Sequence, residues 1–110
     1  MDLGKTGELI ARQYLETKGY KFICANYFAR YGEIDLIMEK SGEVVFVEVK
    51  TRRVGNEVAP NVTLPAAKIR RLEMAIGLYL QKHEAEDWRL ILVAVTMLRD
   101  GMAKVKIIQL

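Results

Sequence analysis

The segment GEIDLIMEKSGEVVFVEVKTR, residues 32–52, constrains the fold more than any other part of this 110-residue chain. Two runs rich in Ile, Val, Leu and Phe flank Ser41 and Gly42, which suit a two-residue hairpin turn. We therefore predict antiparallel strands over residues 33–39 and 43–51. Apolar strands of this kind seldom carry many charges. These two nevertheless carry Glu33, Asp35, Glu48 and Lys50 among their apolar residues.

The turn determines which side chains face each other across the hairpin. With a two-residue turn, the predicted pairs are Asp35 with Glu48, Glu33 with Lys50, and Ile37 with Phe46. A three-residue turn would instead set Asp35 against Val49 and mix the two faces. Strict alternation along the first strand predicts one face with Glu33, Asp35 and Ile37, and the other with Ile34, Leu36 and Met38.

Two carboxylates opposite each other repel, and burial makes the repulsion worse unless a cation lies between them or one is protonated. A divalent ion would resolve the conflict between Asp35 and Glu48, and oxygen ligands favour Mg²⁺ or Mn²⁺. Lys50 projects from the same face as Glu48 and could polarise a water or stabilise charge on a phosphate. The alternative is purely structural, with Glu33 and Lys50 as a cross-strand ion pair and Asp35 at a wet sheet end.

The remaining pattern predicts an α/β protein with the order αβββαββ. We expect a helix over residues 3–18, a strand over 20–29, and a second helix with Ile69, Leu72 and Ile76 on one face. Asn61 or Thr63 could cap that helix, with Pro65 in its first turn. Two more strands, 88–99 and 102–110, flank a tight turn at Asp100 and Gly101. Strands that are apolar throughout imply a central mixed sheet covered by one helix on each face, in a single domain spanning residues 1–110.

Basic residues concentrate in the middle of the chain. Residues 50–71 contain six Lys or Arg side chains and one acid, Glu57, in a chain of formal net charge +3. A localised positive segment favours an anionic partner, with nucleic acid the leading candidate, whereas a solvated helix face is the alternative. We expect phosphate contacts from five of the six: Arg52, Arg53, Lys68, Arg70 and Arg71.

Two further observations concern Glu8 and Cys24. Glu8 borders the apolar face of the first helix and could be a third metal ligand or position a water, although an ion pair with Arg12 is an alternative.

Cys24 is the only cysteine, so an internal disulfide is impossible and a cytoplasmic location is expected. The longest apolar run, residues 90–98, is too short to cross a bilayer, so we expect no membrane partner.

An acid on one strand followed by Glu-x-Lys on the next, in an αβββαβ setting, resembles the PD-(D/E)xK nuclease superfamily. The chain is most similar to the bacterial YraN family, which is endonuclease-like and similar to archaeal Holliday junction resolvases. The resembling parts are residues 4–20, Asn26, residues 32–37, residues 45–52 and Lys68.

The resemblance implies a restriction-endonuclease-like fold and Mg²⁺- or Mn²⁺-dependent cleavage of DNA, with branched or junction DNA among the candidate substrates. Asp35 and Glu48 match the metal-binding acids, and the carbonyl of Val49 often joins them in that superfamily. Lys50 matches the catalytic lysine, and Glu8 matches the first-helix acid of the resolvase-like branch.

Two alternatives to a nuclease follow from the same residues. The fold does not settle the activity, so a nucleic-acid-binding module without catalysis is one alternative. A pure interaction protein, in which the acids of the hairpin are structural, is the other. Junction substrates would favour a symmetric homodimer.

Overall fold

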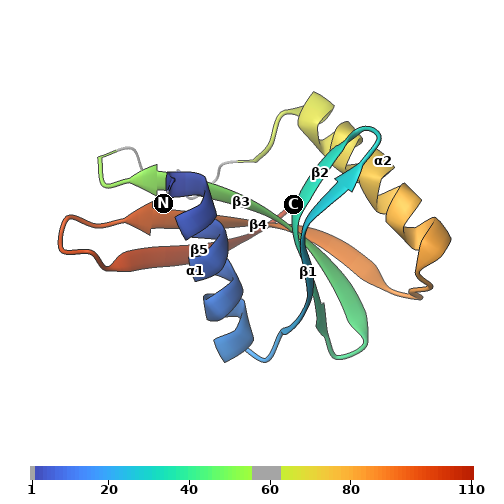
Figure 1. Ribbon diagram of the computed structural model, residues 1–110, viewed down its shortest axis with the longest axis horizontal. Coiled ribbons are helices and arrows are strands. Elements are labelled where there is room, and N and C mark those ends of the chain that lie inside the picture. Colours follow the sequence, from blue (N-terminus) through green and yellow to red (C-terminus); the bar gives the residue numbers. More distant parts are fainter. Residues whose placement is uncertain (1, 56–62) are drawn as a thin grey trace.

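The computed structural model describes residues 2–55 and 63–110 (Figure 1). It confirms the predicted order αβββαββ. The elements are α1 (Leu3–Thr17), β1 (Lys21–Ala29), β2 (Gly32–Lys40), β3 (Glu43–Arg53), α2 (Ala66–Lys82), β4 (Trp88–Met97) and β5 (Ala103–Gln109). None of the described helices is long and apolar enough to cross a membrane.

The five strands form one mixed sheet in the order β1-β2-β3-β4-β5. Three neighbouring pairs are antiparallel, whereas β3 and β4 run parallel. Parallel neighbours need a crossover connection, and α2 lies in the segment that joins them. The two parallel strands are therefore the centre of the fold, with an antiparallel pair of strands on one side and a single strand on the other.

Each helix covers one face of the sheet, as the uninterrupted apolar strands predict. Ala11 and Leu15 of α1 pack against one face, while Leu72 and Ile76 of α2 pack against the other (Figure 1). The central strands contribute to both layers: on β3, Val45 and Val47 lie under α1, whereas Val44 and Phe46 lie under α2. The burial of both faces explains why β3 and β4 lack the polar alternation of a half-exposed strand.

The predicted hairpin register is confirmed for Ile37 with Phe46, whereas the predicted pairs of Asp35 with Glu48 and of Glu33 with Lys50 lie beyond the end of the ladder. The ladder between β2 and β3 runs from Lys40 with Glu43 to Leu36 with Val47. Ser41 and Gly42 have φ values of 53° and 82°, the left-handed conformations of a two-residue turn whose twist matches the strands. The turn residues alone therefore set which β2 side chains meet which β3 side chains.

The prediction of strict alternation along β2 is wrong at one point. Leu36 packs under α1 but Ile34 packs under α2, so the strand reverses its faces at Asp35. On β1 the residue at the same level is Asn26, which has a left-handed φ of 52°. The irregularities of the two strands thus lie side by side, and Asn tolerates the left-handed conformation better than most residues. Because β2 reverses its faces, Glu33 does not share a face with Ile37.

The helix ends also differ in detail from expectation. Asp2 caps α1, because its Oδ1 accepts a 2.8 Å hydrogen bond from the Lys5 N–H. Pro65 occupies the N-cap position of α2 and provides no side-chain hydrogen bond, so Thr63 does not cap this helix. The other candidate cap, Asn61, lies outside the described residues.

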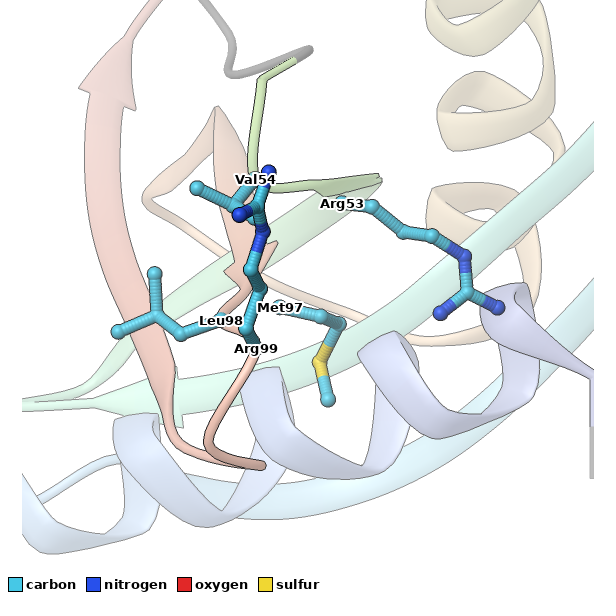
Figure 2. A pocket seen from close by; sticks show the side chains of 5 residues that line it. All are labelled: Arg53, Val54, Met97, Leu98 and Arg99. Atoms are coloured by element: carbon cyan, nitrogen blue, oxygen red, sulfur yellow. The ribbon is translucent and has the colours of Figure 1, made fainter.

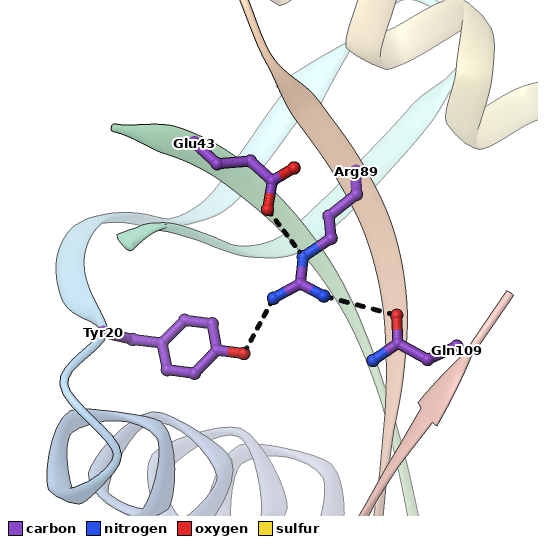
Figure 3. A network of polar contacts seen from close by, with 4 residues as sticks. All are labelled: Tyr20, Glu43, Arg89 and Gln109. Carbon is purple, nitrogen blue, oxygen red and sulfur yellow. Dashed lines mark hydrogen bonds and ion pairs between the residues drawn. The ribbon is translucent and has the colours of Figure 1, made fainter. Parts of the chain in front are cut away.

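Arg89 links three strands to the segment that follows the first helix, at the end of the sheet where β4 begins (Figure 3). The Arg89 guanidinium lies 2.9 Å from a Glu43 carboxylate oxygen, and it donates to the Tyr20 hydroxyl at 3.1 Å and to Gln109 at 3.4 Å. Tyr20 follows α1, Glu43 begins β3 and Gln109 ends β5. This network holds together the end of the sheet remote from Asp35.

Candidate active site

The acids of the hairpin lie where β2 and β3 separate. Their ladder ends at Leu36 with Val47, whereas β3 continues alongside β4 as far as Arg53. Asp35 directly precedes Leu36 on β2, and its Oδ2 accepts a 2.8 Å hydrogen bond from the backbone N–H of Val49. A side-chain carboxylate therefore binds the β3 backbone just beyond the end of the ladder.

Asp35 and Glu48, called here the carboxylate pair, lie close enough for Glu48 to raise the pKa of Asp35. Glu48 is buried, with 8% of its surface exposed, and Asp35 is half-buried. Burial is the main cause that raises the pKa of Asp35 to about 7, and contact with Glu48 and the charge of Glu33 add to it. The hydrogen bond from Val49 acts in the opposite direction. Without a cation, one carboxyl of the pair therefore tends to hold a proton near neutral pH.

The two oxygens of Glu48 have different surroundings. Oε2 lies 3.0 Å from the ammonium of Lys68 on α2, whereas Oε1 is buried and has no hydrogen-bond partner among the described residues. A buried acceptor without a partner is costly, especially when it belongs to a charged group. The surroundings of Oε1 therefore suit a bound cation or a proton shared with Asp35.

A second group of polar side chains joins α1 to the first hairpin. The Asn26 side-chain amide donates to Glu33 Oε1 at 2.6 Å and to Glu8 Oε1 at 3.0 Å. We call Glu8, Asn26 and Glu33 the amide-bridged cluster. The reversal of the faces of β2 puts Glu33 in this cluster, beside the carboxylate pair. Thus Glu33 and Lys50 are not an ion pair in the structure, and Glu8 is not paired with Arg12, which contacts Glu16 instead.

A close approach between α1 and β3 positions Glu8. Gly7 is buried, and a Cβ at that position would overlap the Thr51 hydroxyl and lie 2.8 Å from the Thr51 Cβ. Only glycine allows this spacing without a shift of the helix or the strand. The neighbouring Glu8 is consequently held over the edge of β1, where Asn26 reaches it.

Lys50 lies two residues after Glu48 on β3 and is half-buried. Alternation along the strand puts its side chain on the same face as Glu48. Among the described residues its ammonium takes part in no hydrogen bond or ion pair. Lys50 therefore remains available to a group bound beside Glu48.

The basic residues divide into two sets. Lys68 faces the carboxylate pair, through its ion pair with Glu48, whereas four predicted phosphate contacts, Arg52, Arg53, Arg70 and Arg71, are exposed. Arg53 lines a hollow at the end of β3 and β4, and Figure 2 shows its guanidinium extending away from the other lining side chains. The other lining residues are Val54, Met97, Leu98 and Arg99.

Three of these features were missed by sequence reasoning. The roles of Asn26 and Lys68 depend on contacts between residues far apart in the chain, which no local pattern reveals. Arg99 lies outside the basic segment that the composition singled out, yet it lines the same hollow as Arg53.

Comparison with known proteins places the chain in a family. The model of an uncharacterised protein family, UPF0102, matches residues 7–95, which include both the carboxylate pair and the amide-bridged cluster. The chain belongs to the UPF0102 family. A UPF0102 protein of Symbiobacterium thermophilum is 40% identical over 109 residues, covering 97% of this chain and 92% of the relative. Another from Clavibacter michiganensis is 38% identical over 110 residues, covering 98% and 93%. One from Syntrophomonas wolfei is 48% identical over 80 residues, covering 73% and 70%.

Proposed function

We propose that this UPF0102 protein is a divalent-metal-dependent phosphodiesterase that cleaves DNA. The observation that carries the proposal is the carboxylate pair: two acids in contact, one with a raised pKa and the other with a buried oxygen that has no hydrogen-bond partner in the described part of the chain. Such a pair is unfavourable in a protein that has no use for a cation. It also recurs in the PD-(D/E)xK nucleases that the chain resembles.

The donor set fits a hard ion such as Mg²⁺ or Mn²⁺. Among the described residues no three Asp, Glu, His or Cys side chains converge to form a complete metal cage. This agrees with the habit of Mg²⁺, which is held by one or two carboxylates and completes its shell with water and substrate phosphate. Asp35 and Glu48 would hold the ion, and the resemblance adds the carbonyl of Val49. When bound, the ion would activate the phosphate and a water as a Lewis acid.

The chain's own residues supply the other parts of the reaction. Lys50 stabilises the negative charge that develops on the phosphate during hydrolysis, because it lies on the face of Glu48 and its ammonium has no partner within residues 2–55 and 63–110. Lys68 forms an ion pair with Glu48 and compensates its charge. Glu8, which the resemblance associates with the resolvase-like branch, is held ready by Asn26 to orient a water.

Exposed arginines bind the DNA backbone on either side of the site. Arg52 and Arg53 end β3, and Arg70 and Arg71 lie on the first turns of α2. Contacts of this kind neutralise phosphates without reading the base sequence. We therefore propose recognition of DNA shape, with branched or junction DNA as a candidate substrate and a homodimer as the form that matches its symmetry.

One observation favours a second candidate, a nucleic-acid-binding module without catalysis. The carboxylate pair, without a third converging acid in the described chain, could be a site at which binding persists and metal-dependent cleavage does not. In this candidate the basic residues still bind phosphates, but Lys50 has no catalytic role.

A substrate panel separates the two candidates. Wild-type protein and Glu48→Gln are incubated with single-stranded, duplex, nicked and four-way-junction DNA in Mg²⁺ or Mn²⁺, and with chelator as a blank. We expect metal-dependent cleavage of at least one substrate by wild type and none by Glu48→Gln. Glu73→Gln, at an exposed position of α2, is the control and should cleave normally. Binding without cleavage by wild type would favour the non-catalytic module.

A further inference from the structure

We infer that the tip of the β1–β2 hairpin, residues 28–32, binds unpaired bases by stacking them on Phe28 and Tyr31. The inference rests on the proposed function, since it assumes a nucleic acid near the carboxylate pair, and it specifies the substrate class: DNA with single-stranded or splayed bases beside the bond to be cut. We call the hairpin tip, residues 28–32, the aromatic surface.

The hairpin tip exposes aromatic side chains to an unusual degree. Phe28 has 77% of its surface exposed, the largest value among the exposed large apolar residues of the described chain, and Tyr31 has 39%. Single exposed apolar residues are ordinary on protein surfaces, but here two exposed aromatic residues lie within four positions at one turn. Neither ring contributes to the two core clusters. Their exposure therefore calls for a partner rather than a packing role.

The register places this aromatic surface beside the acids. Phe28 pairs with Glu33 across the hairpin, so the two side chains share a face of the sheet. Asp35 follows two residues later on the same strand, a separation of about 7 Å along a strand. Because β2 reverses its faces at Asp35, this short distance along the strand, and not a shared face, relates Phe28 to Asp35. A nucleotide whose phosphate lies at the carboxylate pair would have a neighbouring base within reach of the Phe28 ring.

Cationic groups surround the hairpin tip. The Arg30 guanidinium lies 5.4 Å from the centre of the Tyr31 ring. Arg71 of α2 lies over the turn, since its Cβ would be 4.0 Å from a Cβ built on Gly32, and Figure 1 shows the hairpin tip beside the first turns of α2. Arginines next to aromatic rings suit an anionic polymer with flat bases. They disfavour a second copy of this chain docked symmetrically on the same surface, because Arg30 and Arg71 would then meet their own equivalents.

Stacking requires a base with a free face. In a duplex both faces of each base are covered by neighbouring bases, whereas single strands, flaps and branch points expose them. The aromatic surface therefore distinguishes DNA by the presence of unpaired bases rather than by sequence. This selectivity is separate from the phosphate contacts, which are common to all forms of DNA.

The test is a binding measurement that needs no cleavage. Fluorescence anisotropy in EDTA is recorded with a labelled oligothymidine and with a labelled duplex of the same length, for wild type, Phe28→Ala, Tyr31→Ala and Arg30→Ala. Each aromatic variant should weaken oligothymidine binding by about tenfold, the usual loss for one stacked base, and leave duplex binding unchanged. Arg30→Ala should weaken both. Met102→Ala is the matched control at the β4–β5 turn, where Met102 is 64% exposed, and it should not alter oligothymidine binding.

Three results would overturn the inference. One is equal oligothymidine affinity for wild type and Phe28→Ala, and another is equal loss of oligothymidine and duplex binding in that variant. The third is a change from dimer to monomer in sedimentation of Phe28→Ala, which would assign the surface to a second copy. None of these results concerns cleavage, so the proposed phosphodiesterase activity can stand or fall independently.

Discussion

Asp35 accepts a 2.8 Å hydrogen bond from the backbone N–H of Val49, and this bond fixes its carboxylate where β2 leaves β3. The same position buries the carboxylate against Glu48, and burial dominates, so the pKa of Asp35 rises to about 7. The geometry that makes the acid useful for a cation thus makes it unfavourable as an isolated anion.

The first prediction is a loss of stability as pH rises in the absence of metal. The folded state keeps the Asp35 proton up to about pH 7, whereas the unfolded chain releases it near pH 4, so the folded state binds more protons in this window. The free energy of unfolding should therefore fall between about pH 4 and pH 7, by an amount on the order of a few kcal/mol. Urea denaturation in EDTA measures it. Asp35→Asn, which still accepts from Val49, should lack this fall and exceed wild type in stability above pH 7.

The second prediction concerns the amide bridge of Asn26. Asn26→Asp replaces the donor with a third carboxylate and should cost about 1–3 kcal/mol at pH 7, with the loss reduced at low pH where the acids are protonated. Asn26→Gly accepts the left-handed backbone and removes the bridge without adding charge, so it is the matched control. If both variants lose the same stability at every pH, the amide does not hold Glu8 and Glu33 together.

The third prediction compares two helix glycines. Gly7→Ala should lower the free energy of unfolding by about 1–3 kcal/mol, because the new methyl group overlaps Thr51. Gly77→Ala on α2 meets nothing within 4 Å and should raise it by about 0.5–1 kcal/mol, the ordinary helix preference of alanine. Thermal or urea denaturation of both variants settles the comparison. A stabilised Gly7→Ala would mean that α1 lies further from β3.

The fourth prediction concerns Lys50. Lys50→Ala should slow single-turnover cleavage by on the order of a hundredfold or more and leave DNA affinity nearly unchanged, because its charge acts mainly in the transition state. Lys50→Arg should restore only part of the rate, since a guanidinium differs from an ammonium in shape and hydration. Lys106→Ala, at an exposed position of β5, is the control. Wild-type cleavage by Lys50→Ala would remove the lysine from the proposed chemistry.

Local chemistry made much of the fold predictable. Ser41 and Gly42 determined the register of the hairpin, and the uninterrupted apolar runs in β3 and β4 predicted a sheet covered on both faces. The order αβββαββ followed from the spacing of these patterns. Each of these features depends on residues close together in the sequence, where turn chemistry and side-chain periodicity apply.

The parts that escaped prediction depend on long-range contacts. The faces of β2 reverse at Asp35, beside the left-handed backbone of Asn26 on β1, and no pattern of apolar residues marks this point. Lys68 reaches Glu48 from a helix twenty residues further along the chain, and Gly7 meets Thr51 only when α1 packs on the sheet. The hairpin that carries the site could therefore be predicted from the sequence, whereas the tertiary contacts that complete the site could not.

The most direct test of the central claim is a calorimetric titration of the folded protein with Mn²⁺. Wild type should bind the ion, and Asp35→Asn and Glu48→Gln should each weaken that binding by at least about tenfold, since one of only two carboxylate ligands is lost. Glu73→Gln, which leaves the carboxylate pair intact, should bind as wild type does. Equal Mn²⁺ binding by wild type and Glu48→Gln, or no binding by wild type, would contradict the assignment of the carboxylate pair as the metal site.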